Sequence, residues 1–253
     1  MSELKLERRD EIAILTLSNP QKRNALDPHL LDALCAALSR LPSEGARVAV
    51  LTGEGDKAFS AGYDIAALPD EAAPSDNPLA RALDAIADGA LPVIAALNGV
   101  AIGGGCELAA TCDLRVAHPS VTLTMPPVRL GLVYSARGLR RFVALCGASR
   151  TRELFLTAEP VDAERALAWG LVDRVVPREQ VLESALGLAG AIAKGAPLAV
   201  RWTRRVLERL EAPLETEVAI EIAELQRRSW MSADAREARL AFKEKRPPKF
   251  AGN

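Results

Sequence analysis

The sequence has few of the residues on which metal and disulfide chemistry depend. Its 253 residues include only two histidines, His29 and His118, so we expect no metal site and expect both rings to lie at the surface. The four cysteines show no CxxC spacing, and a chain of this length can build a core without disulfides. We therefore expect free thiols in a reducing cytoplasm.

The chain also lacks a strong charge of either sign and a long apolar run. With 32 basic and 33 acidic residues, the net charge is -1, which favours neither nucleic acid nor an anionic membrane as a partner. No apolar run approaches the roughly 20 residues that span a bilayer, and the N-terminus "MSELKLERRD" lacks a signal-peptide core. The sequence thus predicts a cytoplasmic protein.

Short apolar runs alternate with helical patterns in the first half of the chain. Asp27 and Pro28 form an N-cap and first-turn pair, and leucines at helical spacing follow, which predicts a helix over 28–41. Strands alternating with helices indicate an α/β architecture with largely parallel strands. The expected strands are 12–17, 48–52, 92–97 and 114–117.

After about residue 137 the pattern becomes helical. A proline-rich segment at 66–78 is expected to be a mobile surface loop. The helices expected in the later part are 148–156, 162–169, 179–194, 197–211 and 214–230.

The stretch "GVAIGGGCELAATCDL" (99–114) places three glycines before a lone acid, Glu107, among apolar residues. Where a strand ends at glycines that begin a helix, the backbone N–H groups are exposed. Such N–H groups favour a negatively charged oxygen as their partner. The spacing fits neither a P-loop nor a dinucleotide fingerprint, so a developing enolate oxygen is the better candidate. The alternative is close helix–strand packing. A second loop, "AFSAGYDI" (58–65), could aim another N–H at the same oxygen.

Taken together, the motifs resemble the crotonase, or enoyl-CoA hydratase/isomerase, superfamily from about residue 5 to residue 250. The resemblance rests on "NPQKRNALD" (19–27), "AFSAGYDI", "LNGVAIGGGCELAATCDLRVA" (97–117), "LTAEPVDAERALAWGLVDRVVP" (156–177) and "AFKEKRPPKF" (241–250). It implies a crotonase-like spiral of ββα units with a helical C-terminal oligomerisation region. It also implies a homotrimer or a dimer of trimers acting on an acyl-CoA thioester, with coenzyme A entering as part of the substrate and no separate cofactor.

In that family two backbone N–H groups hold the thioester oxygen and stabilise its enolate, and matching positions put these donors at Tyr63 and Gly104. The resemblance implies adenine and pantetheine contacts for a further group of residues. It also suggests that Lys22 and Arg23, with Lys245 and Arg246 from a neighbouring subunit, meet CoA phosphates. The alternative for those cations is a solvated surface. The substrate-binding residues expected in this way are Arg23, Ala25, Ala61, Tyr63, Asp64, Ile65 and Gly104.

The sequence departs from the hydratase pattern at the second of two catalytic glutamates. Glu107 matches the first, but Pro127 stands where the second is expected. The segment "MPPVRLGLVYS" resembles the methylmalonyl-CoA decarboxylase branch, which has a tyrosine at the position of Tyr134, although that branch has a histidine where Tyr63 stands. Decarboxylation needs no base to start, since the electrons of the breaking C–C bond become the enolate.

Several roles stay open for the side chains near this motif. Glu107 could protonate the enolate, act as a lone base, or be a helix residue held in a hydrogen bond. Tyr134 could orient a substrate carboxylate, supply a proton, or be a core tyrosine. Arg137 could bind that carboxylate or face solvent.

We therefore predict an α/β core over 1–195 and a helical region over 196–253, with Tyr63, Gly104, Glu107 and Tyr134 as catalytic residues and Arg137 in substrate binding. The expected function is a lyase that decarboxylates a small 2-carboxyacyl-CoA such as methylmalonyl-CoA. The first alternative is an enoyl-CoA hydratase or isomerase that uses Glu107 alone. The second is a non-catalytic crotonase-fold binding protein.

Overall fold

A repeated order of strand, strand and helix builds the first unit of the chain. The computed structural model describes residues 2–64, 77–130, 134–210, 224, 228, 232–244, 246 and 248–253. By its internal contacts the chain divides into two compact units, Met1–Ala189 and Gly190–Asn253. The boundary expected between residues 195 and 196 stays a prediction.

Within the described residues, the larger sheet has six strands and a parallel centre. The pairs β2–β3, β3–β5, β5–β7 and β7–β10 are parallel, and only β1 pairs antiparallel, with β2. The central strands β3 and β5 are buried almost throughout, as their uninterrupted apolar sequences require. In spatial order the strands are β1 (Glu3–Arg9), β2 (Ile12–Ser18), β3 (Val48–Gly53), β5 (Val93–Leu97), β7 (Leu114–Ala117) and β10 (Arg174–Val175).

The smaller sheet has four strands in the described part of the chain. Its strands lie in the order β4 (Ala58–Ser60), β6 (Val100–Ile102), β8 (Thr122–Thr124) and β9 (Val161–Asp162). The pairs β4–β6 and β6–β8 are parallel, so the carboxyl ends of these three strands meet at one edge. Three successive turns, β3–β4, β5–β6 and β7–β8, thus each contribute a strand to the larger sheet and a strand to the smaller sheet before a helix follows, which confirms the spiral of ββα units.

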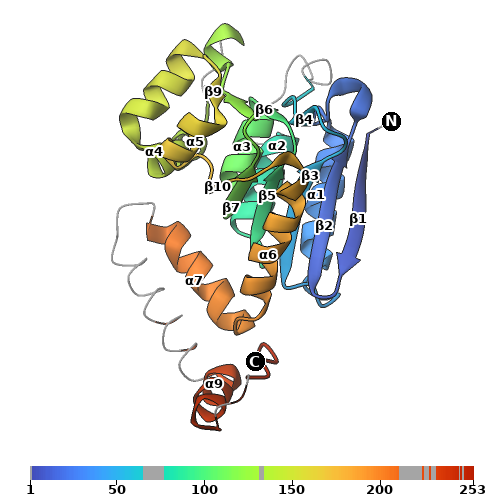
Figure 1. Cartoon of the computed structure of the whole chain (residues 1–253), viewed down its shortest axis with the longest axis vertical. Helices are drawn as coiled ribbons and strands as arrows, with labels where there is room; N and C mark the ends of the chain where they lie inside the picture. The colour runs from blue at the N-terminus through green and yellow to red at the C-terminus, as the bar shows by residue number, and fades with distance from the viewer. Residues whose placement is uncertain are drawn as a thin grey trace. The chain divides into compact units, whose positions relative to one another are not determined.

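The helices of this unit follow their sequence signals closely. Asp27 caps α1 (Pro28–Arg40) by accepting the Leu30 N–H at 2.9 Å, and the buried leucines of α1 face the core. Figure 1 shows α1 and α2 side by side behind the larger sheet. The other helices of this part are α2 (Pro78–Ala87), α3 (Gly104–Thr111), α4 (Ala136–Thr157), α5 (Ala163–Trp169) and the 3-10 turns η1 (Pro20–Lys22), η4 (Pro127–Leu130) and η5 (Arg178–Gln180).

Most of the later helices occur where the sequence predicts them. The expected helices at 162–169, 179–194 and 197–211 correspond to α5, α6 (Val181–Ala193) and α7 (Pro197–Leu210). The helix expected at 148–156 is the second half of α4, which bends at Gly147, a residue with φ 77°. The second unit also contains α9 (Ala233–Glu244).

Some predictions fall on residues that the structure does not describe. These are nearly all of the loop at 66–78, most of the helix at 214–230, Ile65 and Lys245. Among the described residues, no single helix has the length and apolar character to cross a membrane. The bent pair Arg178–Ala193 and Pro197–Leu210 meets that test only when its two helices are counted together.

Candidate active site

The candidate site lies where three parallel strands of the smaller sheet end. Tyr63 follows β4, Gly104 follows β6, and Pro127 follows β8. The Gly103 N–H donates to the Thr124 carbonyl at 2.8 Å, which joins the ends of β6 and β8. Segments distant in the sequence therefore converge because parallel strands share one carboxyl edge.

The Tyr63 N–H is left available by the way its neighbours pair. Leu26 forms a parallel bridge to Tyr63, in which the Leu26 N–H donates to the Gly62 carbonyl and the Leu26 carbonyl accepts the Asp64 N–H, both at 2.8 Å. These bonds use the residues on either side of Tyr63. Its own N–H therefore points away from Leu26, and it has no hydrogen-bond partner among the described residues.

Gly104 places a second backbone donor beside the first. It is the first residue of α3, after Gly103 with φ 52°, so its N–H has no acceptor inside the helix. A Cβ built on Gly104 would lie 3.3 Å from the Tyr63 nitrogen, and one built on Gly62 would lie 3.3 Å from the Gly104 nitrogen. The two nitrogens are therefore close neighbours, and a side chain at either glycine would crowd the space between the loops.

Buried amide side chains hold these loops in place. Asn24 donates to the carbonyls of Glu54 at 3.0 Å and Ala58 at 2.8 Å, and its Oδ1 accepts the Asn19 N–H at 3.0 Å. The Ser60 hydroxyl donates to the Asn24 carbonyl and accepts the Gly62 N–H. The loop that carries Tyr63 is thus fixed by hydrogen bonds that no regular sheet ladder could supply.

Glu107 is an acid whose side chain is almost completely shielded from solvent. It lies in the first turn of α3 and is 4% exposed, and its carboxyl has no hydrogen bond among the described residues. Burial raises the pKa of Glu107 to about 7, and the nearby positive charge of Arg141 opposes this rise. The group can therefore both accept and donate a proton near neutral pH.

Tyr134 lies close to the same acid. Its hydroxyl is 3.9 Å from the position that a Gly103 Cβ would occupy, and its ring meets Phe155 edge-on with centroids 5.5 Å apart. Burial, followed by the negative charge of Glu107, raises the pKa of Tyr134 well above its usual range. The hydroxyl therefore stays protonated and can act as a hydrogen-bond donor at the site.

No second acid accompanies Glu107 in the described part of the chain. Pro127 is buried in the 3-10 turn after β8 and carries no titratable group. Arg141, buried in α4, is the one charged side chain there that perturbs Glu107. Arg141 was not among the predicted site residues, because its only sequence signal is a position in a helix whose start was not predicted.

The structure brings together most of the expected substrate-binding residues. The Arg23 carbonyl accepts the Ala61 N–H at 3.0 Å, which sets Arg23 and Ala25 beside the loop of Tyr63 and Asp64. Asp64 binds the Lys22 ammonium at 2.6 Å, and this contact raises the pKa of Lys22. Their roles in binding CoA stay predictions.

Arg137 has carboxylate partners in the protein itself. It lies near the start of α4, and its guanidinium binds Asp84 at 2.5 Å and Asp88 at 2.9 Å, both on α2. A role for Arg137 in binding a substrate carboxylate stays a prediction, and such a carboxylate would compete with these two acids.

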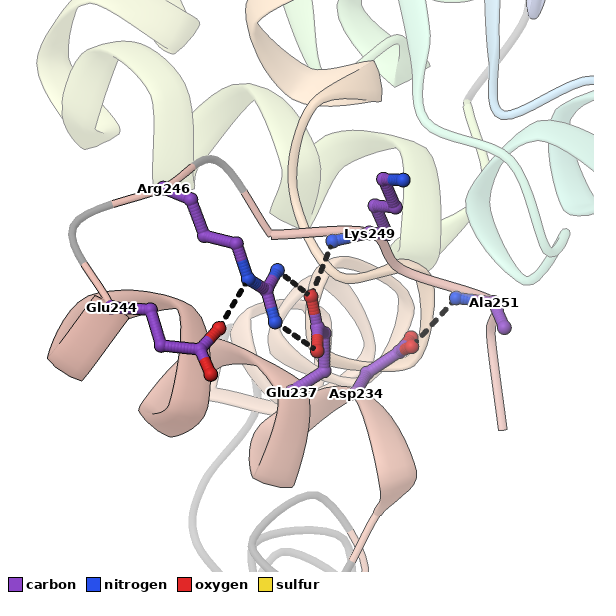
Figure 2. A network of polar contacts seen from close by, with 6 residues as sticks. All are labelled: Asp234, Glu237, Glu244, Arg246, Lys249 and Ala251. Atoms are coloured by element: carbon purple, nitrogen blue, oxygen red, sulfur yellow. Dashed lines mark hydrogen bonds and ion pairs between the residues drawn. The ribbon is translucent and has the colours of Figure 1, made fainter.

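Arg246, the other cation suggested for CoA phosphates, lies in the second unit. Figure 2 shows its guanidinium between Glu237 and Glu244, with Nη1 and Nη2 at 2.6 and 3.1 Å from the Glu237 oxygens. Glu237 also accepts the Lys249 N–H, and Asp234 accepts the N–H groups of Ala251 and Gly252. These contacts fasten the segment 248–253 to α9.

The structure corrects one prediction about the two histidines. His118 is 1% exposed, with Nε2 3.2 Å from the Asn98 carbonyl, so the prediction that it lies at the surface is wrong. Packing between the ends of β5 and β7 buries it, and burial lowers its pKa. His29 is exposed, as predicted. In the described ranges, no group of three or more His, Cys, Asp or Glu side chains is placed to hold a metal ion.

Comparison with known proteins gives consistent matches along the whole chain. Residues 7–253 match the enoyl-CoA hydratase/isomerase family. A protein from Mycobacterium tuberculosis named as a probable enoyl-CoA hydratase is 39% identical over 247 residues, or 95% of this chain and 96% of that protein. The short-chain-enoyl-CoA hydratase of Clostridium acetobutylicum is 32% identical over 250 residues, covering 95% and 94% of the two chains. The crystal structure of an enoyl-CoA hydratase from Bacillus anthracis, 30% identical, superposes with a TM-score of 0.90 over 99% of both chains.

Proposed function

This chain belongs to the enoyl-CoA hydratase/isomerase family of enzymes, and on that premise we propose that it adds water to the double bond of a 2-enoyl-CoA thioester. The observation that carries the proposal is a buried carboxyl, Glu107, with a pKa near 7 in the first turn of the helix that begins at Gly104, whose N–H lies close to that of Tyr63. Because the family is one of enzymes, the alternative of a non-catalytic binding protein is set aside.

The two backbone donors would bind the thioester oxygen. The N–H groups of Tyr63 and Gly104 are free of other partners among the described residues and lie next to each other. Negative charge develops on that oxygen as the enolate forms, and fixed donors stabilise it more than they stabilise the substrate. Loss of one such donor costs about 2.7–4 kcal/mol of transition-state stabilisation in comparable sites.

Glu107 would serve as the single acid–base group. Its carboxylate accepts a proton from water while the water oxygen bonds to C3, and the C2=C3 electrons move into the enolate. The protonated Glu107 then returns that proton to C2, so that the net change is the addition of one water molecule. A pKa near 7 suits both steps, since each form of the carboxyl is then well populated at neutral pH.

The names of similar proteins support hydration over decarboxylation. The relatives from M. tuberculosis and C. acetobutylicum are named as hydratases. A decarboxylase would have less use for Glu107 as a base, because loss of carbon dioxide itself supplies the electrons of the enolate. The preferred interpretation from the sequence analysis therefore becomes the second candidate.

A specific observation keeps decarboxylation of a 2-carboxyacyl-CoA as that second candidate. Pro127 is buried where the second acid is expected, and the Tyr134 hydroxyl lies by Gly103. In this reaction the C–C bond to the carboxylate breaks, its electrons form the enolate, and Glu107 or Tyr134 protonates C2. On this alternative Tyr134→Phe should depress carbon dioxide release strongly and leave CoA affinity nearly intact, whereas hydration through Glu107 should depend much less on Tyr134.

A product assay separates the reactions. The enzyme is given three substrates in parallel: crotonyl-CoA, a 3-enoyl-CoA and methylmalonyl-CoA. The masses of the acyl-CoA products are measured by mass spectrometry. We expect crotonyl-CoA to gain one water, with the wild-type rate lost in Glu107→Gln. Carbon dioxide loss from methylmalonyl-CoA with crotonyl-CoA unchanged would overturn the proposal, as would conversion of the 3-enoyl-CoA alone.

The remaining expectations from the resemblance stay proposals. We expect a homotrimer or a dimer of trimers, which light scattering on a sizing column would measure. We also expect the purified enzyme to act without an added cofactor, and we expect it to reside in the cytoplasm.

A further inference from the structure

The first turn of α4 is packed directly against the Glu107 carboxyl. A Cβ built on Gly138 would overlap the Glu107 Oε1 atom and would lie 3.5 Å from Cδ. The carboxyl thus occupies the space that any larger side chain at position 138 would need. Gly138 has no unusual backbone conformation, so its lack of a side chain is explained by this contact.

Ser135 binds the backbone N–H of Gly138, the residue that lies against the Glu107 carboxyl. It is the N-cap of α4, and its hydroxyl accepts the Gly138 N–H at 3.1 Å. The first N–H groups of a helix have no acceptor within the helix and bind whatever acceptor is nearest. The Glu107 carboxyl lies against the same residue, with Oε1 in the space of a Gly138 Cβ, while the serine hydroxyl holds the Gly138 N–H.

We propose that Ser135 and Gly138 are positioning residues for Glu107. Glycine leaves the room in which the carboxyl sits, and the serine hydroxyl occupies the N–H that would otherwise bind the ionised carboxylate. The inference deepens the proposed function and rests on it, because the acid–base role of Glu107 is what the arrangement serves.

The surroundings of Glu107 show why one more donor would matter. The titratable and charged groups that interact with it are Arg141 on α4, Cys106 on α3, and Tyr134 before α4. Only Arg141 favours the ionised form, and burial outweighs it. A backbone N–H bonded to the carboxylate would add to the effect of Arg141 and keep Glu107 ionised at neutral pH.

The first test titrates Glu107 directly, without any turnover. Glutamate labelled with ¹³C at the side-chain carboxyl is incorporated into the full chain, and Glu107→Gln identifies the Glu107 signal. We expect Ser135→Ala and Ser135→Gly each to lower the pKa of Glu107 by about one unit, because the freed Gly138 N–H binds the carboxylate. Ser135→Thr, which keeps a hydroxyl, should restore the wild-type value.

A matched variant separates this effect from the loss of a helix cap. Asp162 caps α5 by accepting the Arg165 N–H at 2.8 Å. Asp162→Ala should lower the melting temperature as Ser135→Ala does, and leave the pKa of Glu107 unchanged. A pKa of Glu107 that stays at its wild-type value in both Ser135→Ala and Ser135→Gly would overturn the role of Ser135. Ser135→Gly removes the hydroxyl and leaves a residue type that helices accept at the N-cap, so the folded protein remains available for the test.

The second test fills the space at position 138. Gly138→Ala should displace the carboxyl and lower kcat for hydration by tenfold or more, with KM within twofold of wild type. Gly187→Ala is the control, since Gly187 lies in α6 with nothing within 4 Å of an added Cβ. Wild-type kcat in Gly138→Ala would overturn the role of Gly138. Absence of hydration in the wild type would instead contradict the proposed function and leave the titration of Glu107 to decide the positioning role.

Discussion

The pKa values of two glutamates, one in each unit of this chain, are shifted in opposite directions. Glu107, in the first unit, is buried without a hydrogen bond among the described residues, and its pKa rises to about 7. Glu237, in the second unit, binds Arg246 through both oxygens and accepts the Lys249 N–H, and its pKa falls to about 2. The same type of side chain can therefore exchange a proton near neutral pH in one place, and in the other it stays anionic and fastens a segment of chain.

The largest expected effect comes from removing the two carboxylates in turn. Glu107→Gln keeps the shape of the side chain and removes its titration, so kcat should fall by about 10²–10⁴-fold. Glu237→Gln should keep kcat within twofold of wild type. Steady-state kinetics on crotonyl-CoA measure both, and equal losses in the two variants would contradict the comparison.

The two shifts also predict opposite dependence of stability on pH. Because the pKa of Glu107 is raised from 4.5 to about 7 by folding, the folded state holds its proton more tightly than the unfolded state does. The free energy of unfolding should therefore fall as pH rises from 4.5 to 7, by about 3 kcal/mol. Urea unfolding at pH 5 and pH 8 should show this loss in wild type relative to Glu107→Gln. The same difference between the two proteins at both pH values would show that Glu107 is not desolvated.

A buried amide in the first unit is expected to contribute more to stability than the part-buried ion pair of Glu237 and Arg246 does in the second unit. Asn24 is 1% exposed and binds three backbone groups, so Asn24→Ala removes a partner from each of them, although the Ala58 carbonyl keeps a bond from Asn98 at 3.3 Å. We expect the free energy of unfolding to drop by on the order of 2–3 kcal/mol. Urea denaturation measures it, with Ser43→Ala, which removes one exposed hydroxyl bond to the Arg40 carbonyl, as control. A loss no greater than that of the control would argue against amide support of the loop.

The smallest effect is expected in the second unit. A lowered pKa means that Glu237 contributes to stability above pH 4.5 and loses that contribution as pH falls toward 2. At neutral pH, Glu237→Gln should mainly speed hydrogen exchange at the Lys249 amide, because that N–H donates a hydrogen bond to Glu237. The Ala251 amide, bound by Asp234, serves as the internal control. Equal acceleration at both amides would mean that the segment opens as one piece.

The parts of the fold that local sequence encodes were predictable. The Asp27 cap, Pro28 and the spaced leucines specify α1, and the apolar runs specify β2, β3, β5 and β7. β1 was missed because it is a largely exposed edge strand in which polar residues outnumber apolar ones. The start of α4 was missed because Gly138 and Gly147 interrupt its pattern, and Gly138 is explained only by Glu107, 31 residues earlier.

The candidate site was predictable where its chemistry depends on glycine and a lone acid. Gly104 and Glu107 could be predicted as site residues from their residue types, and Tyr63 from the resemblance to the family. The partners of Arg137 lie 49 and 53 residues away, and the burial of His118 depends on its contact with Asn98. Such long-range contacts leave no local pattern, and this is why Arg141, Ser135 and Gly138 emerged only from the structure.

The choice of main-chain donors has a consequence for how such a site can change over evolutionary time. An N–H group survives every exchange of side chain except replacement by proline. Under the proposed function, the Tyr63 N–H would therefore remain as the oxygen-binding donor whichever side chain stood at position 63, proline excepted. The side chain at that position could then diversify while the proposed electrostatic stabilisation of the enolate was kept by the backbone.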